Sequence, residues 1–206
     1  MMDWVKPLVE IVNEVGRRDI SIGHLFLILL YTLERGVIGR YTLSRRLRLS
    51  EATVRNILEK LKERNILEAI RGGHRLTNYG KDIVSRITNV IKIGDTPKSA
   101  CLKPYSKLIQ VKGLGERIPD VIDIRDEVVR MGGRGAVILW FKGGDLIFPD
   151  SGLSVDVWNK DIKRDLFNMY ELDEGDLILI TYAENELDAL LSGLNVAFLI
   201  KMGELE

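Results

Sequence analysis

The feature that most constrains this chain is a pair of short helical patterns separated by a joint of only two residues. Along "LSEATVRNILEKL", residues 49–61, four apolar residues recur at helical spacing and therefore share one face: Val54, Ile57, Leu58 and Leu61. Ser50 is a suitable N-cap for this helix, and Thr42 is a suitable N-cap for the shorter pattern "LSRRLR" before it. A short helix, a turn at Leu49–Ser50 and a second amphipathic helix predict a helix-turn-helix.

The secondary-structure elements predicted before and after this pair follow the order of a known architecture. Two helical patterns precede the pair, at residues 3–16 and 24–36. The second has apolar residues on most of its faces. After the pair, the strand-like runs "ILEAIR" and "HRLT" are joined by Gly72 and Gly73, which predicts a hairpin, and a further helix follows over residues 79–91. Helices followed by a hairpin and another helix are the organisation of a winged helix-turn-helix.

The outward face of the second helix of the pair carries small, hydrogen-bonding and cationic residues near its start, instead of the Lys and Glu residues common on solvated helices. In a helix-turn-helix, this helix lies in the major groove of B-DNA with its N-terminal end foremost. There Ala52 can meet a thymine methyl group, Arg55 can form two hydrogen bonds with guanine, and Asn56 can form two with adenine. Glu59 and Glu63 would repel phosphates, so base contacts are expected only from the first two turns. The expected base-contacting residues are Glu51, Ala52, Thr53, Arg55 and Asn56.

Cationic and hydrogen-bonding residues on both sides of this helix suit the DNA backbone. Between Arg40 and Arg75, ten Lys/Arg oppose four Asp/Glu, a net charge of +6. The residues expected to hold phosphates are Arg40, Tyr41, Thr42, Arg45, Arg46, Arg48 and Ser50. The wing expected to reach a minor groove or adjacent phosphates consists of Arg71, Gly72, Gly73, His74 and Arg75. The alternative is an outer face that is merely solvated.

The charge of the chain divides it into two halves. Residues 1–95 carry 17 Lys/Arg and 11 Asp/Glu, a net charge of +6, whereas residues 96–206 carry 13 and 19, a net charge of −6. A length of 206 residues allows two domains. The segment "GDTPKSA", which is rich in small residues and contains proline, lies where the net charge changes from positive to negative. We therefore predict domains at 1–93 and 102–206 with a linker at 94–101. The basic half favours a polyanion as its partner.

The second half alternates between strand and helix patterns. Strands are expected at "SKLIQVKG", "GAVILWF", "DLIFP" and "GDLILITYA", and helices at "IDIRDEVVRMGG", "NKDIKRDLFNMY" and "ENELDALLSGLNVAFLIK". This pattern predicts a mixed α/β domain, which makes the whole chain α+β. The acidic residues of "LDEGDL" and "YAENELDALL" are expected to belong to a turn and to the start of a helix, where the helix dipole favours acids.

The stretch "YTLSRRLRLSEATVRNILEKLKERNILEAIRGGHRLTNYGKDIV" resembles the winged-helix domains of prokaryotic transcription regulators, including metal-dependent repressors and the MarR group. The resemblance covers roughly residues 20–92. The whole chain is similar to an archaeal family that joins such a domain to a C-terminal domain of unknown function, which implies a transcriptional regulator. Metal binding is not implied, because this chain lacks the cluster of His, Cys and carboxylate ligands that metal-dependent repressors use.

Metal binding and covalent catalysis find little support in the sequence. His24, His74 and Cys101 show no close ligand spacing, so no metal or cofactor is expected. Cys101 has no histidine in its own half, and no G-x-S-x-G motif is present, so no nucleophilic site is expected. A single cysteine also excludes an intramolecular disulfide. No catalytic residue is therefore assigned, and the chain is not expected to be an enzyme.

The glycine-rich loop "VKGLGERIP" is the candidate ligand site of the second half. Lys112 and Arg117 could hold an anion there, although the "GK[ST]" ending of a P-loop is missing. The loop resembles the "GLGEG" loop of archaeal CTP-dependent riboflavin kinases. Arg117 stands where that family has glycine, and the family's tyrosine pair and "PGTLN" segment are missing. A nucleotide-dependent enzyme with an appended winged helix is kept as an alternative.

These observations together predict a DNA-binding transcriptional regulator. The first domain would read double-stranded DNA, and the second would sense a small molecule, form a homodimer, or do both. The candidate dimer surfaces are the helix around Trp4 and the last helix, residues 184–201. The longest apolar run, residues 25–31, is too short for a membrane span, and no secretory leader opens the chain, so we expect a cytoplasmic protein without a membrane partner. A protein-interaction module that uses the winged helix without DNA is the remaining alternative.

Overall fold

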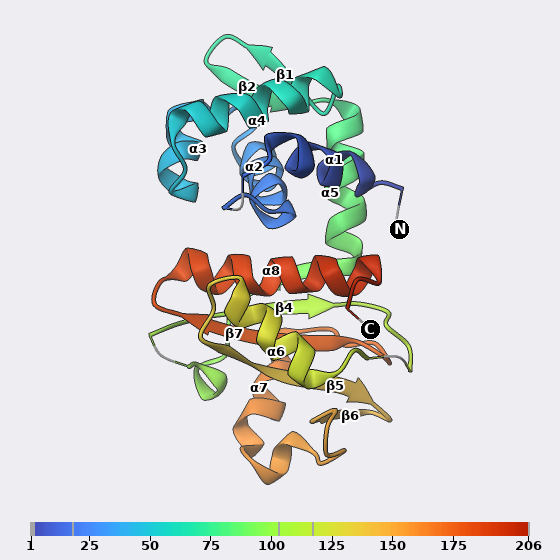
Figure 1. The fold of residues 1–206 in the computed structure, drawn as a ribbon. Helices are drawn as coiled ribbons and strands as arrows, with labels where there is room; N and C mark the ends of the chain where they lie inside the picture. Colours follow the sequence, from blue (N-terminus) through green and yellow to red (C-terminus); the bar gives the residue numbers. More distant parts are fainter. Residues whose placement is uncertain (1–2, 18, 103, 117, 206) are drawn as a thin grey trace. The chain divides into compact units, whose positions relative to one another are not determined.

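The computed structural model describes residues 3–17, 19–102, 104–116 and 118–205, and it divides into two compact units (Figure 1). The first unit extends to Thr88 and the second begins at Asn89. Each unit is described by itself. The α+β class predicted from the sequence is confirmed, with a helical unit and hairpin first and a sheet covered by helices second.

The first unit contains helices and one two-stranded hairpin. Its helices are α1 (Lys6–Val15), α2 (Ile22–Arg35), α3 (Arg40–Leu47), α4 (Glu51–Glu63) and α5 (Asn78–Val90), whose last residues reach into the second unit. Its hairpin is formed by β1 (Leu67–Ile70) and β2 (Gly73–Leu76). Apolar side chains at helical spacing form the core between the helices, as the sequence predicted: Leu8, Ile11, Leu43, Leu47, Val54, Ile57, Leu58 and Leu61.

Helix α1 is tied to the far end of α4 by an ion-pair network. Glu14 accepts a hydrogen bond of 2.7 Å from Lys60 Nζ and a second from Arg64. These hydrogen bonds hold the pKa of Glu14 below its ordinary value. Lys60 and Arg64 are therefore engaged within the unit.

The joint between α3 and α4 explains why both helices end where they do. Arg48 adopts a left-handed conformation with φ of 54° and ends α3, and the hydroxyl of Ser44 donates to the Leu49 carbonyl over 2.6 Å. Ser50 then caps α4 by accepting from the Thr53 amide over 3.1 Å, as predicted. The N-cap predicted at Thr42 is wrong: Gly39, in an extended conformation, precedes the first residue of α3, so Thr42 lies inside its first turn.

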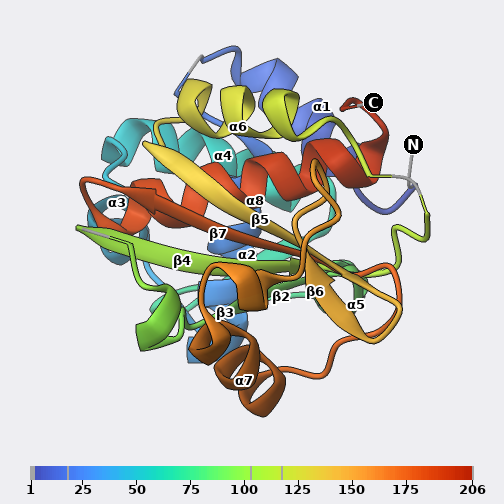
Figure 2. The same ribbon diagram turned by 90° about the horizontal axis from the view of Figure 1, so that it is seen from below.

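The second unit is built on a five-stranded antiparallel sheet. Its strands are β3 (Ile91–Gly94), β4 (Tyr105–Val111), β5 (Gly135–Lys142), β6 (Asp145–Ile147) and β7 (Leu177–Ala183), in the spatial order β3-β4-β7-β5-β6. Helices α6 (Val121–Arg130) and α8 (Glu186–Met202) cover one face, and α7 (Lys160–Met169) with the short helix η2 (Val155–Val157) covers the other (Figure 2).

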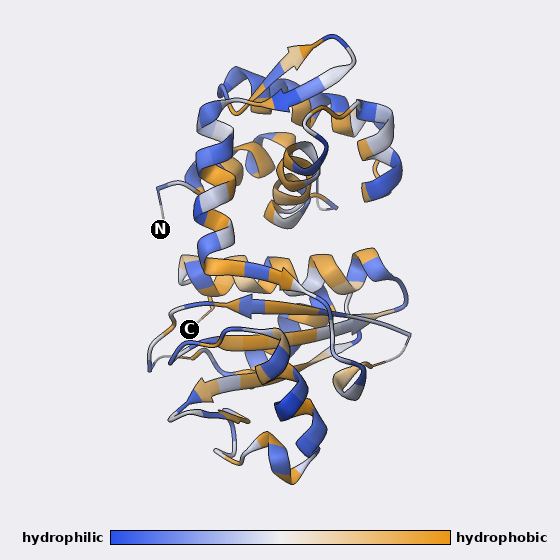
Figure 3. Cartoon of the chain, turned by 180° about the vertical axis from the view of Figure 1, so that it is seen from behind, coloured by the Kyte–Doolittle hydropathy of each residue, from blue (hydrophilic) through white to orange (hydrophobic). Residues whose placement is uncertain are grey.

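Successive side chains of β4 and β7 point to opposite faces of this sheet, so both strands contribute to the packing on each face. On the α7 face, the buried side chains form one cluster: Ala100, Leu108, Leu139, Leu146, Val155, Ile162, Leu166, Ile178 and Ile180. On the opposite face, Thr181 donates to the Ala189 carbonyl of α8 over 2.6 Å. In the second unit, Figure 3 shows hydrophobic colouring along the strands of the sheet and on part of α8. No helix of the described residues is long and apolar enough to cross a membrane.

The second unit begins earlier than the predicted domain boundary. Strand β3 pairs with β4, with Ile91 opposite Val111, so residues 91–93 belong to the second sheet and not to the first domain. The segment predicted as the linker 94–101 also belongs to this unit, because Ser99 of the short helix η1 (Lys98–Ala100) donates to Asp165 over 2.7 Å. Small residues and proline here mark a packed connection in place of a free linker.

Candidate nucleic-acid interface

The outward face of α4 carries the residues predicted to contact bases. Glu51, Ala52, Arg55 and Asn56 are exposed, while the apolar stripe on the other side is buried. Helix α3, the start of α4 and the β1–β2 hairpin lie along one side of the first unit (Figure 1). The first two turns of α4 are therefore open to a macromolecule that approaches from that side.

Thr53 does not belong to this outward face, which corrects the sequence prediction. Its side chain is 6% exposed, and its hydroxyl lies 2.8 Å from the hydroxyl of Ser50. Because the Ser50 hydroxyl also caps the Thr53 amide, the two residues form a local cap at the start of α4. Thr53 caps the helix from its buried side and does not face outward.

Arg40 and Glu51 join the first residues of α3 and α4. The Arg40 Nε lies 3.4 Å from Glu51 Oε2, and the two side chains are 58% and 50% exposed. Such an exposed pair contributes little to stability and exchanges partners easily. Arg40 can therefore turn to a phosphate, and the carboxylate of Glu51 is then available as an acceptor.

The ten cations between Arg40 and Arg75 divide into paired and unpaired groups. Lys60 and Arg64 are held by Glu14, and Arg75 donates to Glu68 across the hairpin over 2.7 Å. With Arg40 paired to Glu51, six cations remain without an ion pair among the residues that the structure describes: Arg45, Arg46, Arg48, Arg55, Lys62 and Arg71.

Two of these unpaired cations rest against aromatic rings of the first unit. The guanidinium carbon of Arg46 lies 4.6 Å from the centroid of the Tyr31 ring, and that of Arg45 lies 5.9 Å from the Tyr41 ring. A ring beneath a guanidinium orients it without neutralising its charge. Arg45, Arg46 and the exposed Tyr41 are thus presented on the surface of α3.

The hairpin is a short wing whose tip differs by one residue from the prediction. Strands β1 and β2 pair from Leu67 with Leu76 to Ile70 with Gly73, so the two-residue loop is Arg71–Gly72, and Gly73 belongs to β2. Arg71 therefore sits at the tip and is exposed. The tip end of β2 is fixed by Ile38 and His74, whose backbones exchange hydrogen bonds of 2.9 and 3.0 Å.

Gly73 is required by the contact between the wing and Ile38. Its φ is +152°, and a Cβ at this position would lie 2.4 Å from the Ile38 carbonyl oxygen. We expect Gly73→Ala to lower the free energy of unfolding by about 2 kcal/mol, because the backbone of Ile38 must move. Urea denaturation followed by circular dichroism measures the loss.

The matched control for Gly73 is Gly39→Ala. Gly39 has a negative φ of −91°, and a Cβ there would lie 3.8 Å from its nearest neighbour, the Gly72 carbonyl oxygen. This change should cost about 1 kcal/mol or less, since only an N-cap glycine is lost. Equal losses in the two variants would contradict the role given to the Ile38 contact.

His74 is not a cation of the wing, which corrects a second prediction. The residue is half-buried, its Nδ1 has no hydrogen-bond partner among the described residues, and burial lowers the pKa of its imidazole, with Lys62 adding repulsion. At neutral pH His74 is therefore uncharged, and the positive charge of the wing comes from Arg71 and Arg75.

The lowered pKa of His74 predicts a pH dependence of stability. Because its pKa in the folded protein lies below the unfolded value of 6.5, the unfolded state takes up the proton first. The contribution of neutral His74 is complete above pH 6.5 and is lost as the pH falls toward the folded-state pKa. We expect His74→Gln to show a smaller decrease in unfolding free energy below pH 6.5 than the wild type; identical slopes would contradict this.

The loop of the second unit that was predicted as an anion site is used internally. Arg117 lies outside the described residues. Lys112 forms an ion pair of 2.6 Å with Asp173, which raises the pKa of the lysine. The amide of Gly113 donates to Asp176 over 3.0 Å, and that of Leu114 donates to the Gly175 carbonyl over 3.1 Å. These groups stabilise the loop, so the prediction that Lys112 holds an anion is not supported by its contacts.

Asp176 is a structural residue that the sequence analysis missed. Its carboxylate is completely buried and accepts from three donors: the Gln110 amide at 2.7 Å, the Gly113 N–H and the Asp173 N–H. From the sequence, this residue was expected to belong to an acidic turn. No group of three or more His, Cys, Asp or Glu suited to a metal is present among the residues with a described placement.

The fold and the exposed surface define the class of the first unit. A helix-turn-helix with an exposed second helix, a wing, and cations that have no ion pair among the described residues is an arrangement typical of domains that bind duplex DNA.

Comparison with known proteins agrees with this class. Residues 22–91 match the family model described as a CggR N-terminal DNA binding domain, and residues 102–202 match a model described as a domain of unknown function, DUF4443. The chain is also similar to a solved structure, "Hypothetical protein PH0730 from Pyrococcus horikoshii OT3", with 27% sequence identity and a TM-score of 0.70 over 91% of this chain and 96% of that chain. No curated protein matches significantly.

Proposed function

We propose that this protein is a transcriptional regulator in which α4 reads an operator in the major groove. The observation that carries the proposal is the start of α4, where Ala52, Arg55 and Asn56 are exposed. The preceding helix and the hairpin add cations that have no ion pair among the described residues. The match of residues 22–91 to a DNA-binding family supports the same conclusion. The architecture matched is that of a DNA-binding regulator with a second domain of unknown function.

Each exposed residue in the first two turns of α4 has a base that suits its chemistry. Arg55 would form two hydrogen bonds with guanine O6 and N7, and Asn56 would form two with adenine N6 and N7. Ala52 would contact a thymine methyl group, and Glu51, once released by Arg40, would accept from cytosine N4. An operator half-site containing guanine and adenine at neighbouring positions follows from this assignment.

The cations around α4 would fix the register of the domain on the duplex. Arg45, Arg46 and Arg48 of the helix-turn-helix would contact phosphates on one side of the major groove, and Arg71 at the wing tip would contact the neighbouring backbone or minor groove. Such contacts carry no sequence information, but they supply the salt-dependent part of the affinity.

The second unit would form the homodimer and make DNA binding respond to a small molecule. A homodimer would place two copies of α4 on two half-sites about one helical turn apart, and a small molecule bound to the second unit would alter that spacing. The acidic charge of residues 96–206 fits a domain that stays away from DNA.

The experiment that tests the proposal is selection of genomic fragments by the full-length protein, followed by footprinting of the enriched fragments. The proposal predicts a short protected sequence, repeated with two-fold symmetry. Enrichment of unrelated fragments without a shared motif would refute operator reading by α4.

A further inference from the structure

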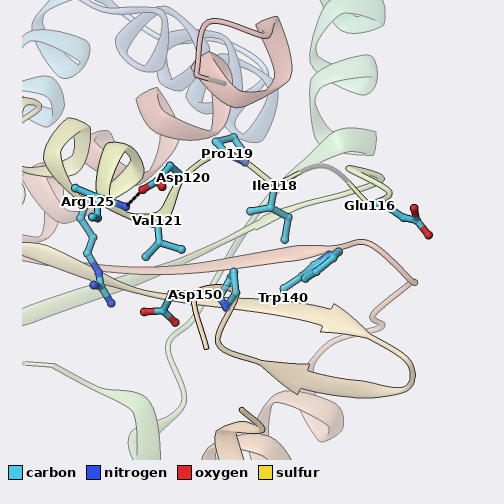
Figure 4. Close-up of a pocket in the computed structure, with 10 residues that line it drawn as sticks. Glu116, Ile118, Pro119, Asp120, Val121, Arg125, Trp140 and Asp150 are labelled. Carbon is cyan, nitrogen blue, oxygen red and sulfur yellow. Dashed lines mark hydrogen bonds between the residues drawn. The ribbon is translucent and has the colours of Figure 1, made fainter. Parts of the chain in front are cut away.

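A pocket of about 470 Å³ opens beside the first turn of α6 in the second unit (Figure 4). Three segments line it: the loop that ends at Pro119 with the start of α6, Trp140 of β5, and the turn at Pro149–Asp150. A neighbouring hollow against α8 shares Glu116, Ile118 and Pro119 but lacks Arg125 and Asp150.

Two opposite charges stand at one end of this pocket without neutralising each other. Figure 4 shows Arg125 of α6 and Asp150 directed toward the same end of the pocket. Both are exposed, and neither takes part in an ion pair or hydrogen bond within the described part of the chain. A guanidinium and a carboxylate that lack partners can each form a charge-assisted hydrogen bond with a ligand of the opposite charge.

The other carboxylates at the pocket do not compete for a ligand. Asp120 is the N-cap of α6 and accepts from the Ile122 amide over 2.7 Å, the dashed contact in Figure 4. The carboxylate of Glu116 is directed away from the pocket in the same view. The start of α6 is thus already capped by an acid. Among the described residues that line the pocket, Arg125 and Asp150 are the charged groups directed toward an occupant.

The rest of the lining is apolar and includes an exposed aliphatic side chain. Ile118, Val121 and Pro149 line the wall, and Ile122 at the rim is 64% exposed. Trp140 contributes an indole whose Nε1 is buried without a hydrogen-bond partner among the described residues. Lys142 lies 4.3 Å from the centroid of this ring, so Trp140 is held by a neighbour on its own strand.

We infer that this pocket binds a small zwitterion with an apolar side chain, the chemistry of an α-amino acid. The guanidinium of Arg125 takes the carboxylate, Asp150 takes the ammonium group, and the apolar wall with Trp140 takes the side chain. Binding of this ligand does not depend on the proposed function; only its role as the effector of a regulator rests on that proposal.

The test is isothermal titration calorimetry of the full-length protein, in the absence of DNA, with three probes. L-Phenylalanine carries both charges, 3-phenylpropionate carries only the carboxylate, and 2-phenylethylamine carries only the ammonium group. We expect saturable one-to-one binding of L-phenylalanine or, for a narrower pocket, L-leucine, at least about tenfold tighter than either phenyl analogue. Equal affinity for an analogue with one charge, or no binding of either amino acid, would overturn the inference.

Variants at the two charges complete the test. Arg125→Gln and Asp150→Asn should each weaken amino-acid binding by about tenfold or more, since each removes one charge-assisted contact. The matched control is Arg130→Gln, on the same helix, where the arginine pairs with Glu127 and does not line the pocket. Unchanged affinity in both pocket variants would overturn the assignment. Because DNA is absent, failure here leaves operator binding untouched, and failure of operator binding leaves this site untouched.

Discussion

Replacing Arg55 and Asn56 together by alanine is expected to remove sequence-specific DNA binding and leave the fold intact. Both side chains are exposed on α4 and form no ion pair or hydrogen bond within the described residues, so their loss costs little stability. Each would contribute a two-hydrogen-bond contact worth about 1–3 kcal/mol of discrimination between bases. The variant should therefore bind a selected operator about 100-fold or more weakly, measured by fluorescence anisotropy.

The control for this variant is Lys62→Ala. Lys62 is exposed on the same helix two turns beyond Arg55, and its loss removes the same charge. It should weaken binding to selected and scrambled duplexes alike, and only modestly, because it lies beyond the two turns that face the groove. Equal loss of specificity in the two variants would show that α4 contributes charge and no base reading.

Replacing Asp176 by alanine is expected to cause the largest loss of stability in the second unit. The carboxylate is fully buried, and its removal leaves the Gln110 side chain and the N–H groups of Gly113 and Asp173 without their acceptor. Unsatisfied buried donors cost about 1–3 kcal/mol each, so we expect a decrease of about 3 kcal/mol or more in the free energy of unfolding. Thermal denaturation at neutral pH measures it.

Two further variants separate this role from a general effect of charge. Asp176→Asn keeps one acceptor oxygen and should lose less stability than the alanine variant. Asp173→Ala removes a carboxylate that is largely exposed and paired only with Lys112, so it should change stability by less than about 1 kcal/mol. A loss at Asp173 as large as that at Asp176 would contradict the buried-acceptor account.

Periodic patterns predicted most of the fold because they report burial directly. The apolar stripe of α4 and the alternation of β4 and β7 each match a buried face of the structure. The outward positions of α4 followed from the same periodicity, apart from Thr53. A threonine three residues after a serine N-cap can turn inward to the cap, and helical spacing alone does not distinguish this from an outward position.

What the sequence could not predict depends on contacts between distant segments. The charge state of His74 is set by burial beside Ile38, and the burial of Asp176 is set by Gln110 and by the loop at Gly113. Local composition shows only a basic hairpin and an acidic turn at these places. The pocket between Arg125 and Asp150 likewise joins a helix to a turn that is 25 residues later in the chain. No short-range pattern connects them.

Operator reading by α4 is tested by the affinity of the wild-type protein for a selected and a scrambled duplex, measured over a series of salt concentrations. Fluorescence anisotropy provides both curves. The account predicts that the logarithm of affinity falls linearly with the logarithm of salt for both duplexes, and that the selected duplex keeps a constant advantage of about 1,000-fold or more. Equal affinity for the two duplexes at every salt concentration, or no binding to either at moderate salt, would contradict it.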